Sequence, residues 1–135
     1  MSDAAAYEAE TDGIVVRVRP AFLTDQSDPA AGRWVWAYQI EIENRGRETV
    51  QLVSRHWTIT DGVGRVTQVD GLGVVGEHPV LRPGERYDYA SGCPLRTDSG
   101  AMSGRYRMAG DDGRAFDVAI PPFSLDVPQA RRTLN

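Results

Sequence analysis

The sequence of 135 residues lacks the features of several protein classes. Its single cysteine, Cys93, excludes an internal disulfide and fits a reducing compartment. The first residues contain no basic start followed by an apolar stretch, and no later run approaches the roughly 18 apolar residues of a membrane span. We therefore expect a cytoplasmic protein without a membrane partner.

Lysine is absent as well, since all 15 basic residues are arginine. Arginine suits bidentate contacts with phosphate and carboxylate groups, but a genome-wide codon bias explains its exclusive use more simply, and we draw no function from it. The formal net charge of -4 argues against a nucleic-acid partner, because domains that bind polyanions usually carry a basic face.

No segment sustains the helical period of 3.6 residues, whereas alternation with period two recurs along the chain. The clearest strand separates its apolar side chains from its polar ones, with Trp34, Trp36, Tyr38, Ile40 and Ile42 on one face and Gln39, Glu41 and Glu43 on the other. A strand is also expected over residues 50–60, with Val53, Trp57 and Ile59 in phase. Later, the pair Pro121 and Pro122 ends a strand pairing or places its strand at a sheet edge.

Seven or eight such strands predict an all-β fold, an immunoglobulin-like or fibronectin type III-like β-sandwich of two antiparallel sheets. We expect one domain over residues 13–127, with an N-terminal extension at 1–12 and a flexible C-terminal tail at 128–135.

Residues 81–87 resemble the tyrosine corner of such sandwiches, because a turn at Pro83 and Gly84 precedes Tyr87, whose hydroxyl would return to upstream backbone. An ordinary hairpin turn followed by a half-buried tyrosine is the alternative. The three tryptophans, Trp34, Trp36 and Trp57, are expected in the core, with a platform that stacks nucleic-acid bases as a second interpretation.

Several short motifs occur together in one order and spacing, namely Ser54 to Trp57, Gly71 to Pro79, Leu81 to Gly84, Tyr87 to Gly92 and Gly100 to Tyr106. With them, the chain resembles the ApaG family over about residues 13–127. The resemblance implies a fibronectin type III-like sandwich of unassigned activity. The family's other name, CorD, comes from a magnesium and cobalt efflux phenotype, and related eukaryotic domains are regarded as protein-binding modules. No catalytic residues are implied.

Gly71, Gly73 and Gly76 spell the GxGxxG pattern of dinucleotide-binding loops. Such a loop precedes a helix whose amides hold the pyrophosphate, whereas here Pro79 and then Pro83 follow, so a dinucleotide fold is excluded. Two interpretations are left. The segment is a tight connection packed on the sheet through Val74 and Val75, or its amides form an anion site for pyrophosphate or a phosphate-rich nucleotide, helped by an arginine across the loop, namely Arg55, Arg65 or Arg82.

His56 and His78 are the only histidines, and no cysteine or acidic pair lies at a metal-ligand spacing around either, so we expect neither a metal nor a cofactor. Ser54 and His56 share a strand face, which raises a hydrolase hypothesis with Asp61 as the orienting group. Side chains two apart on a strand stand parallel, however, so a hydrogen-bonded sheet residue is the favoured interpretation of His56. Cys93 is expected to be a buried or half-buried thiol.

The leading hypothesis is a non-enzymatic module that binds another protein through edge strands and end loops. A binder of phosphate-rich nucleotides or pyrophosphate at residues 71–76 is the alternative. A homodimer through a free sheet edge is also credible. The sequence does not identify the partner.

Overall fold

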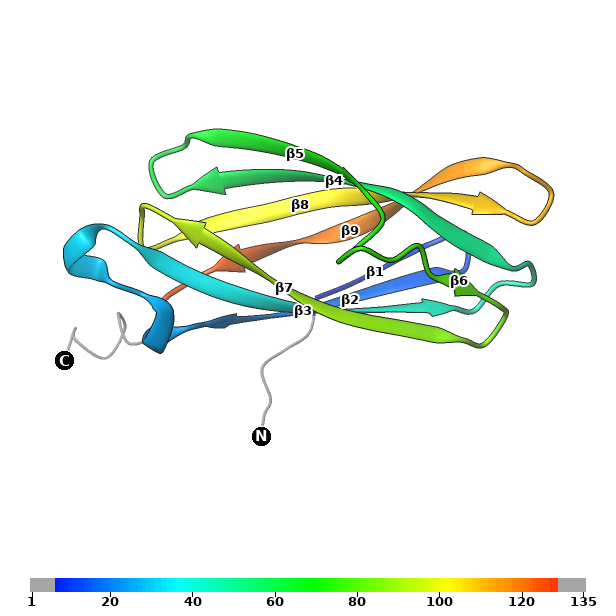
Figure 1. Cartoon of the computed structure of the whole chain (residues 1–135), viewed down its shortest axis with the longest axis horizontal. Coiled ribbons are helices and arrows are strands. Elements are labelled where there is room, and N and C mark those ends of the chain that lie inside the picture. Colours follow the sequence, from blue (N-terminus) through cyan, green and yellow to red (C-terminus); the bar gives the residue numbers. More distant parts are fainter. Residues whose placement is uncertain (1–6, 129–135) are drawn as a thin grey trace.

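The structure is a computed structural model that describes residues 7–128, and in this range nine strands form two sheets packed face to face (Figure 1). The first sheet has the order β1 (Tyr7–Thr11), β2 (Ile14–Phe22), β3 (Trp34–Asn44), β7 (Arg86–Leu95). The second has the order β5 (Val66–Leu72), β4 (Val50–Asp61), β8 (Gly100–Gly110), β9 (Ala115–Leu125), and β6 (Val80–Leu81) also pairs with β4. All pairings are antiparallel, which confirms the predicted sandwich.

The described strands number nine rather than seven or eight because residues 7–11 of the expected extension form β1 and residues 80–81 form the short β6. The only helical elements described are two 3-10 turns, Thr24–Gln26 and Pro29–Ala31. Within residues 7–128, none of the helices has the length and apolar character needed to cross a membrane. Of the expected C-terminal tail, residues 129–135 lie outside the described residues.

The core fills the space between the sheets with the apolar face predicted for β3. Trp36 and Trp57 are buried, as predicted, and Trp34 is partly buried against the same cluster. The ring of Trp57 contacts Tyr38 from the opposite sheet at 5.3 Å and Phe123 at 6.0 Å, both edge to face. Such pairs add about 0.5–1.5 kcal/mol each beyond their buried area, so this cluster joins β3, β4 and β9.

Strand β4 changes phase in its middle. Val50 and Leu52 point into the core, but the pairing with β8 shifts by one residue between Leu52 and Ser54. This β-bulge leaves Val53 exposed and turns Trp57 inward. The prediction that Val53 shares a face with Trp57 is therefore wrong, because it assumes an unbroken period of two.

Strand β9 continues through Pro121 and Pro122, where a second register shift accommodates them. It is the last strand of its sheet, which confirms the edge alternative and rules out the end of pairing. Its free side lies against β1, where the Tyr7 hydroxyl is 3.0 Å from the Ser124 hydroxyl and Thr11 Oγ1 accepts the amide of Ala119 at 3.2 Å. This side of the sandwich is thus closed.

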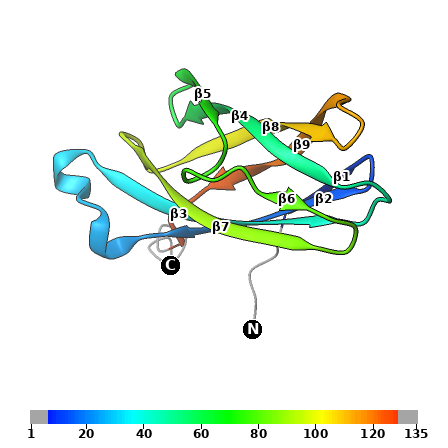
Figure 2. The ribbon, with the colours of Figure 1, turned by 45° about the vertical axis from the view of Figure 1, so that its right-hand side comes forward.

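The opposite side of the sandwich lies between the edges of β5 and β7. Both views of the ribbon show the connection from β5 to β6 crossing this side (Figure 1, Figure 2). Because β5 and β6 pair with the same side of β4, one after the other, they act as a single interrupted edge strand. We call residues 66–81 the β5–β6 edge.

Asn44 ties the turn after β3 to the turn between β6 and β7. It is fully buried, and its side chain makes three hydrogen bonds with backbone groups, donating to the carbonyls of Glu48 and Leu81 and accepting from the amide of Gly46. Its backbone carbonyl accepts the amide of Gly84 at 2.7 Å. A buried amide side chain with all these partners fixes both turns.

The turn between β6 and β7 is closed by the Glu85 amide, which donates to the Arg82 carbonyl at 2.9 Å, with Pro83 and Gly84 between them. Tyr87 is half-buried, and its ring centroid lies 6.2 Å from that of Tyr89. None of the described hydrogen bonds joins its hydroxyl to upstream backbone, as a tyrosine corner would.

Cys93 is buried between the sheets, as predicted for this thiol. Burial raises the pKa of its thiol to about 11, so the residue is a neutral core side chain rather than a reactive thiolate.

Replacing Asn44 tests this buried network. Asn44→Ala should lower the free energy of unfolding by about 3 kcal/mol, because it leaves buried backbone groups without partners. Urea denaturation measures the change, and Gln39→Ala, an exposed change on the same strand, should stay within about 0.5 kcal/mol. Equal losses in the two variants would contradict the role assigned to Asn44.

Candidate functional site

The bulge at Val53 sorts the next side chains of β4 onto two different faces. Arg55 follows the inward phase of Trp57, while Ser54 and His56 face outward from the second sheet. The four residues Ser54 to Trp57 therefore lie on two faces of the sheet, with Arg55 and Trp57 toward the core and Ser54 and His56 toward solvent.

The glycine segment leads into a tight hairpin and not into a helix, which confirms the prediction that excluded a dinucleotide fold. After β5, the amides and carbonyls of Val74 and Glu77 exchange hydrogen bonds of 2.9 and 2.8 Å across a two-residue turn. Both turn residues have positive φ, 43° at Val75 and 81° at Gly76, as a type I′ turn requires. We call residues 73–78 the glycine hairpin.

The two valines of this hairpin behave differently. Val74 is fully buried and anchors the hairpin in the core, as predicted, whereas Val75 at its tip is exposed. The prediction that both valines pack on the sheet is thus wrong for Val75, because the turn rotates its side chain outward. A β-branched residue with positive φ is strained by about 1–3 kcal/mol.

Arg55 is the arginine that faces the glycine segment. Its Nη1 donates to the carbonyl oxygens of Leu72 at 3.1 Å and Gly73 at 2.7 Å. The guanidinium lies over Gly71 so closely that a Cβ there would be 2.6 Å from Cζ of Arg55. Gly71 is needed for this approach, and Arg55 holds the hairpin to β4.

The expected anion site is only partly assembled by this arrangement. Gly71, Gly73 and Gly76 lie together with Arg55, but the amide of Gly73 already donates to the Val53 carbonyl at 2.9 Å. The exposed Arg82 belongs to the turn before β7, where its amide donates to Glu85. Arg65 pairs with Asp61 at 2.7 Å.

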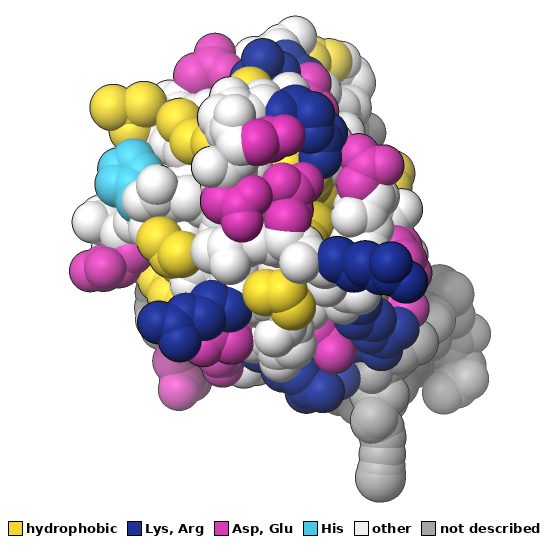
Figure 3. All heavy atoms as spheres, turned by 90° about the vertical axis from the view of Figure 1, so that its right-hand side faces the viewer, with side chains coloured by type: hydrophobic (Ala, Val, Ile, Leu, Met, Phe, Trp, Pro, Cys, Tyr) yellow, Lys and Arg dark blue, Asp and Glu magenta, His cyan; other side chains and the backbone are white. Residues whose placement is uncertain are grey.

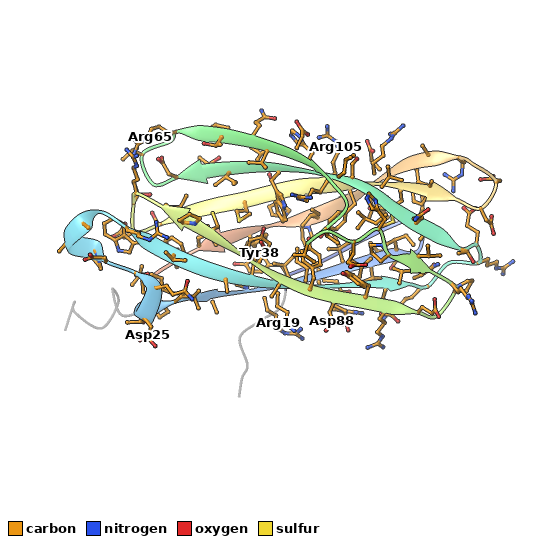
Figure 4. All side chains as sticks on the ribbon, viewed as in Figure 1. Arg19, Asp25, Tyr38, Arg65, Asp88 and Arg105 are labelled. Atoms are coloured by element: carbon orange, nitrogen blue, oxygen red, sulfur yellow. The ribbon has the colours of Figure 1, made fainter. Side chains whose placement is uncertain are left out.

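Three tyrosines lie near Arg55 between the sheets, and Figure 4 shows Tyr38 in that interior. The hydroxyls of Tyr89 and Tyr106 are 2.6 Å apart. Burial raises the pKa of each of these hydroxyls, most strongly at Tyr106, while the Arg55 charge acts in the opposite direction. The hydroxyls are therefore neutral and serve as a structural hydrogen-bonded pair.

The outward-facing Ser54 and His56 line a shallow hollow of about 180 Å³ on the outer face of the second sheet. Its lining comes from four strands and consists of Ser54, Arg55, His56, Asp70, Arg105, Arg107 and Asp117. His56 Nδ1 lies 2.5 Å from Asp70 Oδ1, so the carboxylate orients the ring. The side chain beside His56 is thus Asp70 and not the expected Asp61.

Asp61 instead closes the hairpin between β4 and β5. Burial acts to raise the pKa of its carboxyl, but hydrogen bonds from the Arg65 amide and guanidinium and from the Val63 amide outweigh that effect and lower it. This removes Asp61 from the hydrolase hypothesis, which required it next to His56.

One group of acidic side chains is close enough to offer ligands to a metal ion within the described part of the chain. Oxygens of Glu48, Asp111 and Asp112 lie within 4.8 Å of one another, and Glu48 also pairs with Arg114 at 2.8 Å. An exposed acidic group that already has an arginine partner is not by itself a metal site.

Exposed apolar side chains are concentrated on the β5–β6 edge. In residues 7–128, five of the seven large hydrophobic residues that are exposed lie on this edge, namely Val66, Val69, Leu72, Val75 and Val80, while Val53 is on the neighbouring β4 and Val63 is in the hairpin before β5. Leu72 is the most exposed, at 75%. Figure 3 shows hydrophobic side chains around a histidine along one margin of the molecule, whereas the rest of that view is mostly polar and charged.

Comparison with known proteins now places this geometry in a family. The model of the ApaG domain matches residues 24–110. The chain belongs to the ApaG family. It is 58% identical over 129 residues to the protein ApaG of Brucella canis, covering 96% of this chain and 99% of the relative. It is 57% identical over 134 residues to the protein ApaG of Caulobacter vibrioides, covering 99% and 96%.

A crystal structure of the ApaA protein from Bordetella pertussis resembles the ApaG fold described here, with a TM-score of 0.84 and 47% sequence identity over 86% of this chain and 94% of that one. None of these names states an activity.

Sequence reasoning missed the partners that the strand register brings together. Asp70 lies opposite His56 on β5, and Arg105 lies opposite His56 on β8. The alternating arginines on the polar face of β8 can be seen in the sequence. Their distance from His56 cannot, because it depends on the register between β4 and β8.

Gly71→Ala tests the contact of Arg55 with the glycine segment. The new Cβ displaces the guanidinium and breaks its bonds to the Leu72 and Gly73 carbonyls, so the free energy of unfolding should fall by about 1–2 kcal/mol. Gly92→Ala on β7, where nothing lies nearer than 3.5 Å, should change it by about 0.5 kcal/mol or less. In an Arg55→Ala background the cost of Gly71→Ala should vanish, and an unchanged cost there would refute the contact.

Proposed function

We propose that this ApaG domain is a non-enzymatic module that binds an extended segment of a partner protein along the β5–β6 edge. The observation that carries the proposal is the confinement of the exposed large hydrophobic residues to positions 53–80 in the described chain. Exposed apolar surface gathered in one place is typical of protein-binding sites, whereas scattered residues are not.

The free edge of β5 supplies the second element of such a site. Beyond β5 the second sheet has no further strand in the described chain, so one side of its backbone is unpaired. Edge strands usually carry lysine, proline or several charges that discourage pairing, but β5 has the sequence VTQVDGL with Asp70 as its single charge. A partner strand added here would gain backbone hydrogen bonds, while Leu72 and Val75 would contact its side chains.

The other edges are less suited to a partner strand. β9 lies against β1, and β7 contains Arg86, Asp88 and Pro94. Strained backbone at the hairpin tip also favours a functional role, because folding alone gains nothing from holding Val75 outward.

The alternative function, an anion bound by residues 71–76, is supported by the proximity of Arg55 to the three glycines. It is disfavoured because Arg55 donates to carbonyls and the Gly73 amide is already bonded. An anion there would have to replace these contacts.

Leu72→Asp is the direct test of the interaction surface. Tagged chain is purified from its native host at physiological salt, and the amount of any protein that copurifies is compared between variants. Burying the new carboxylate against an apolar partner surface should reduce recovery about tenfold or more. Ala90→Asp places the same charge on the β7 edge and should leave recovery unchanged. Leu72 is 75% exposed, so its replacement should not unfold the domain.

Three results would count against the proposal. One is recovery of the chain alone in repeated purifications, and another is equal loss with the two aspartate variants. Self-association of the pure chain that Leu72→Asp abolishes would assign the edge to a second copy instead, and sedimentation measures this.

Val75→Asn separates binding from folding at the hairpin tip. Asparagine is favoured at this position of a type I′ turn, so the free energy of unfolding should rise by about 1 kcal/mol. Recovery of the partner should fall, because the apolar side chain is lost. A more stable domain that binds as well as the wild type would show that Val75 does not contact the partner.

A further inference from the structure

We propose that the hollow on the outer face of the second sheet binds a phosphate group, with Ser54, His56, Arg105 and Arg107 as its ligands. This site is separate from the glycine segment and does not depend on the proposed protein partner. The four side chains come from two neighbouring strands, and the bulge at Val53 determines which of them face outward.

The strand register brings these groups together. His56 on β4 is directly opposite Arg105 on β8, and Ser54 is opposite Arg107. Such cross-strand neighbours have Cβ atoms about 4.5–5.5 Å apart. Figure 4 shows Arg105 projecting from the outer side of the second sheet, away from the core. A hydroxyl, an imidazole and two guanidinium groups therefore share one small surface.

The size of the hollow limits the ligand. At about 180 Å³ it is smaller than the roughly 300–1,000 Å³ of sites that enclose a drug-sized molecule. A compact group, either free or at the end of a larger molecule that extends into solvent, fits this volume. A whole nucleotide does not fit inside it.

Arg105 is the cation of the hollow that is open to an anion. The Arg55 guanidinium bonds the Leu72 and Gly73 carbonyls on the inner face, so the charged groups on the outer face are two arginines and two aspartates, which balance before His56 is counted. Asp117 lies near both arginines. It accepts a hydrogen bond from Arg107 at 3.0 Å, whereas Arg105 is 3.9 Å away, beyond hydrogen-bond distance. Arg105 thus keeps donors for a ligand.

The pair of His56 and Asp70 holds a further ring nitrogen at the hollow. Because Asp70 accepts the Nδ1 proton, the ring is held in one orientation and Nε2 is its free nitrogen. In the imidazolium form Nε2 donates to an anion. Donors that approach from several directions suit the tetrahedral oxygens of phosphate better than the planar oxygens of a carboxylate, and guanidinium groups bind phosphate in a bidentate manner.

Titration with inorganic phosphate, followed by amide resonances in two-dimensional NMR at constant ionic strength and neutral pH, tests the site. We expect saturable shifts at residues 54–56 and 105–107. Arg105→Gln should weaken binding about tenfold, the effect of losing one charge-assisted hydrogen bond. Arg19→Gln is the matched control, because it removes the same charge from the outer side of the first sheet, where Figure 4 places Arg19.

Unsaturable shifts, or equal weakening by the two glutamine variants, would overturn the proposal. Acetate that binds as tightly as phosphate would overturn the tetrahedral assignment. A phosphoserine peptide and its unphosphorylated form identify the source of the group. Tighter binding of the phosphopeptide than of inorganic phosphate supports a phosphate carried by a protein, and equal binding supports a free phosphate.

Discussion

The extra residue in β4 is the constraint on which the rest of the molecule depends. Val53 has no residue opposite it on β8, so the two halves of β4 present opposite phases to the core. The same step turns Trp57 inward to meet Tyr38 and sends His56 outward. Without it, the tryptophan would lie in solvent and the histidine in the core, at a cost of several kcal/mol for each.

The edge strand is interrupted at the same place. β5 ends opposite Ser54 and β6 pairs with Val50 and Gln51, so the gap between them lies beside the bulge, and the glycine hairpin fills it. Val74 and Arg55 hold that hairpin from the core side, and Val75 is left exposed at its tip. The apolar edge and the polar hollow thus both lie beside one local irregularity.

Much of the fold could be predicted because β3 and β8 keep an unbroken period of two, and because the prolines after Gly76 exclude a helix. The face of β4 on which Val53 lies could not be predicted, because the residues around a bulge have no distinctive composition. The pairing of His56 with Asp70 depends on the register of the β4–β5 hairpin, and sequence spacing alone pointed to Asp61. Local pattern determines which face a side chain occupies, whereas its neighbours depend on pairing between strands.

Cross-strand proton contacts in solution NMR test the phase change in β4 most directly. The account predicts that the α-proton of Trp57 lies beside those of Gly104, as the shifted register requires. Continuing the register of Leu52 and Met108 without a bulge would place Trp57 beside Ser103 instead, and contacts of that kind would contradict the account.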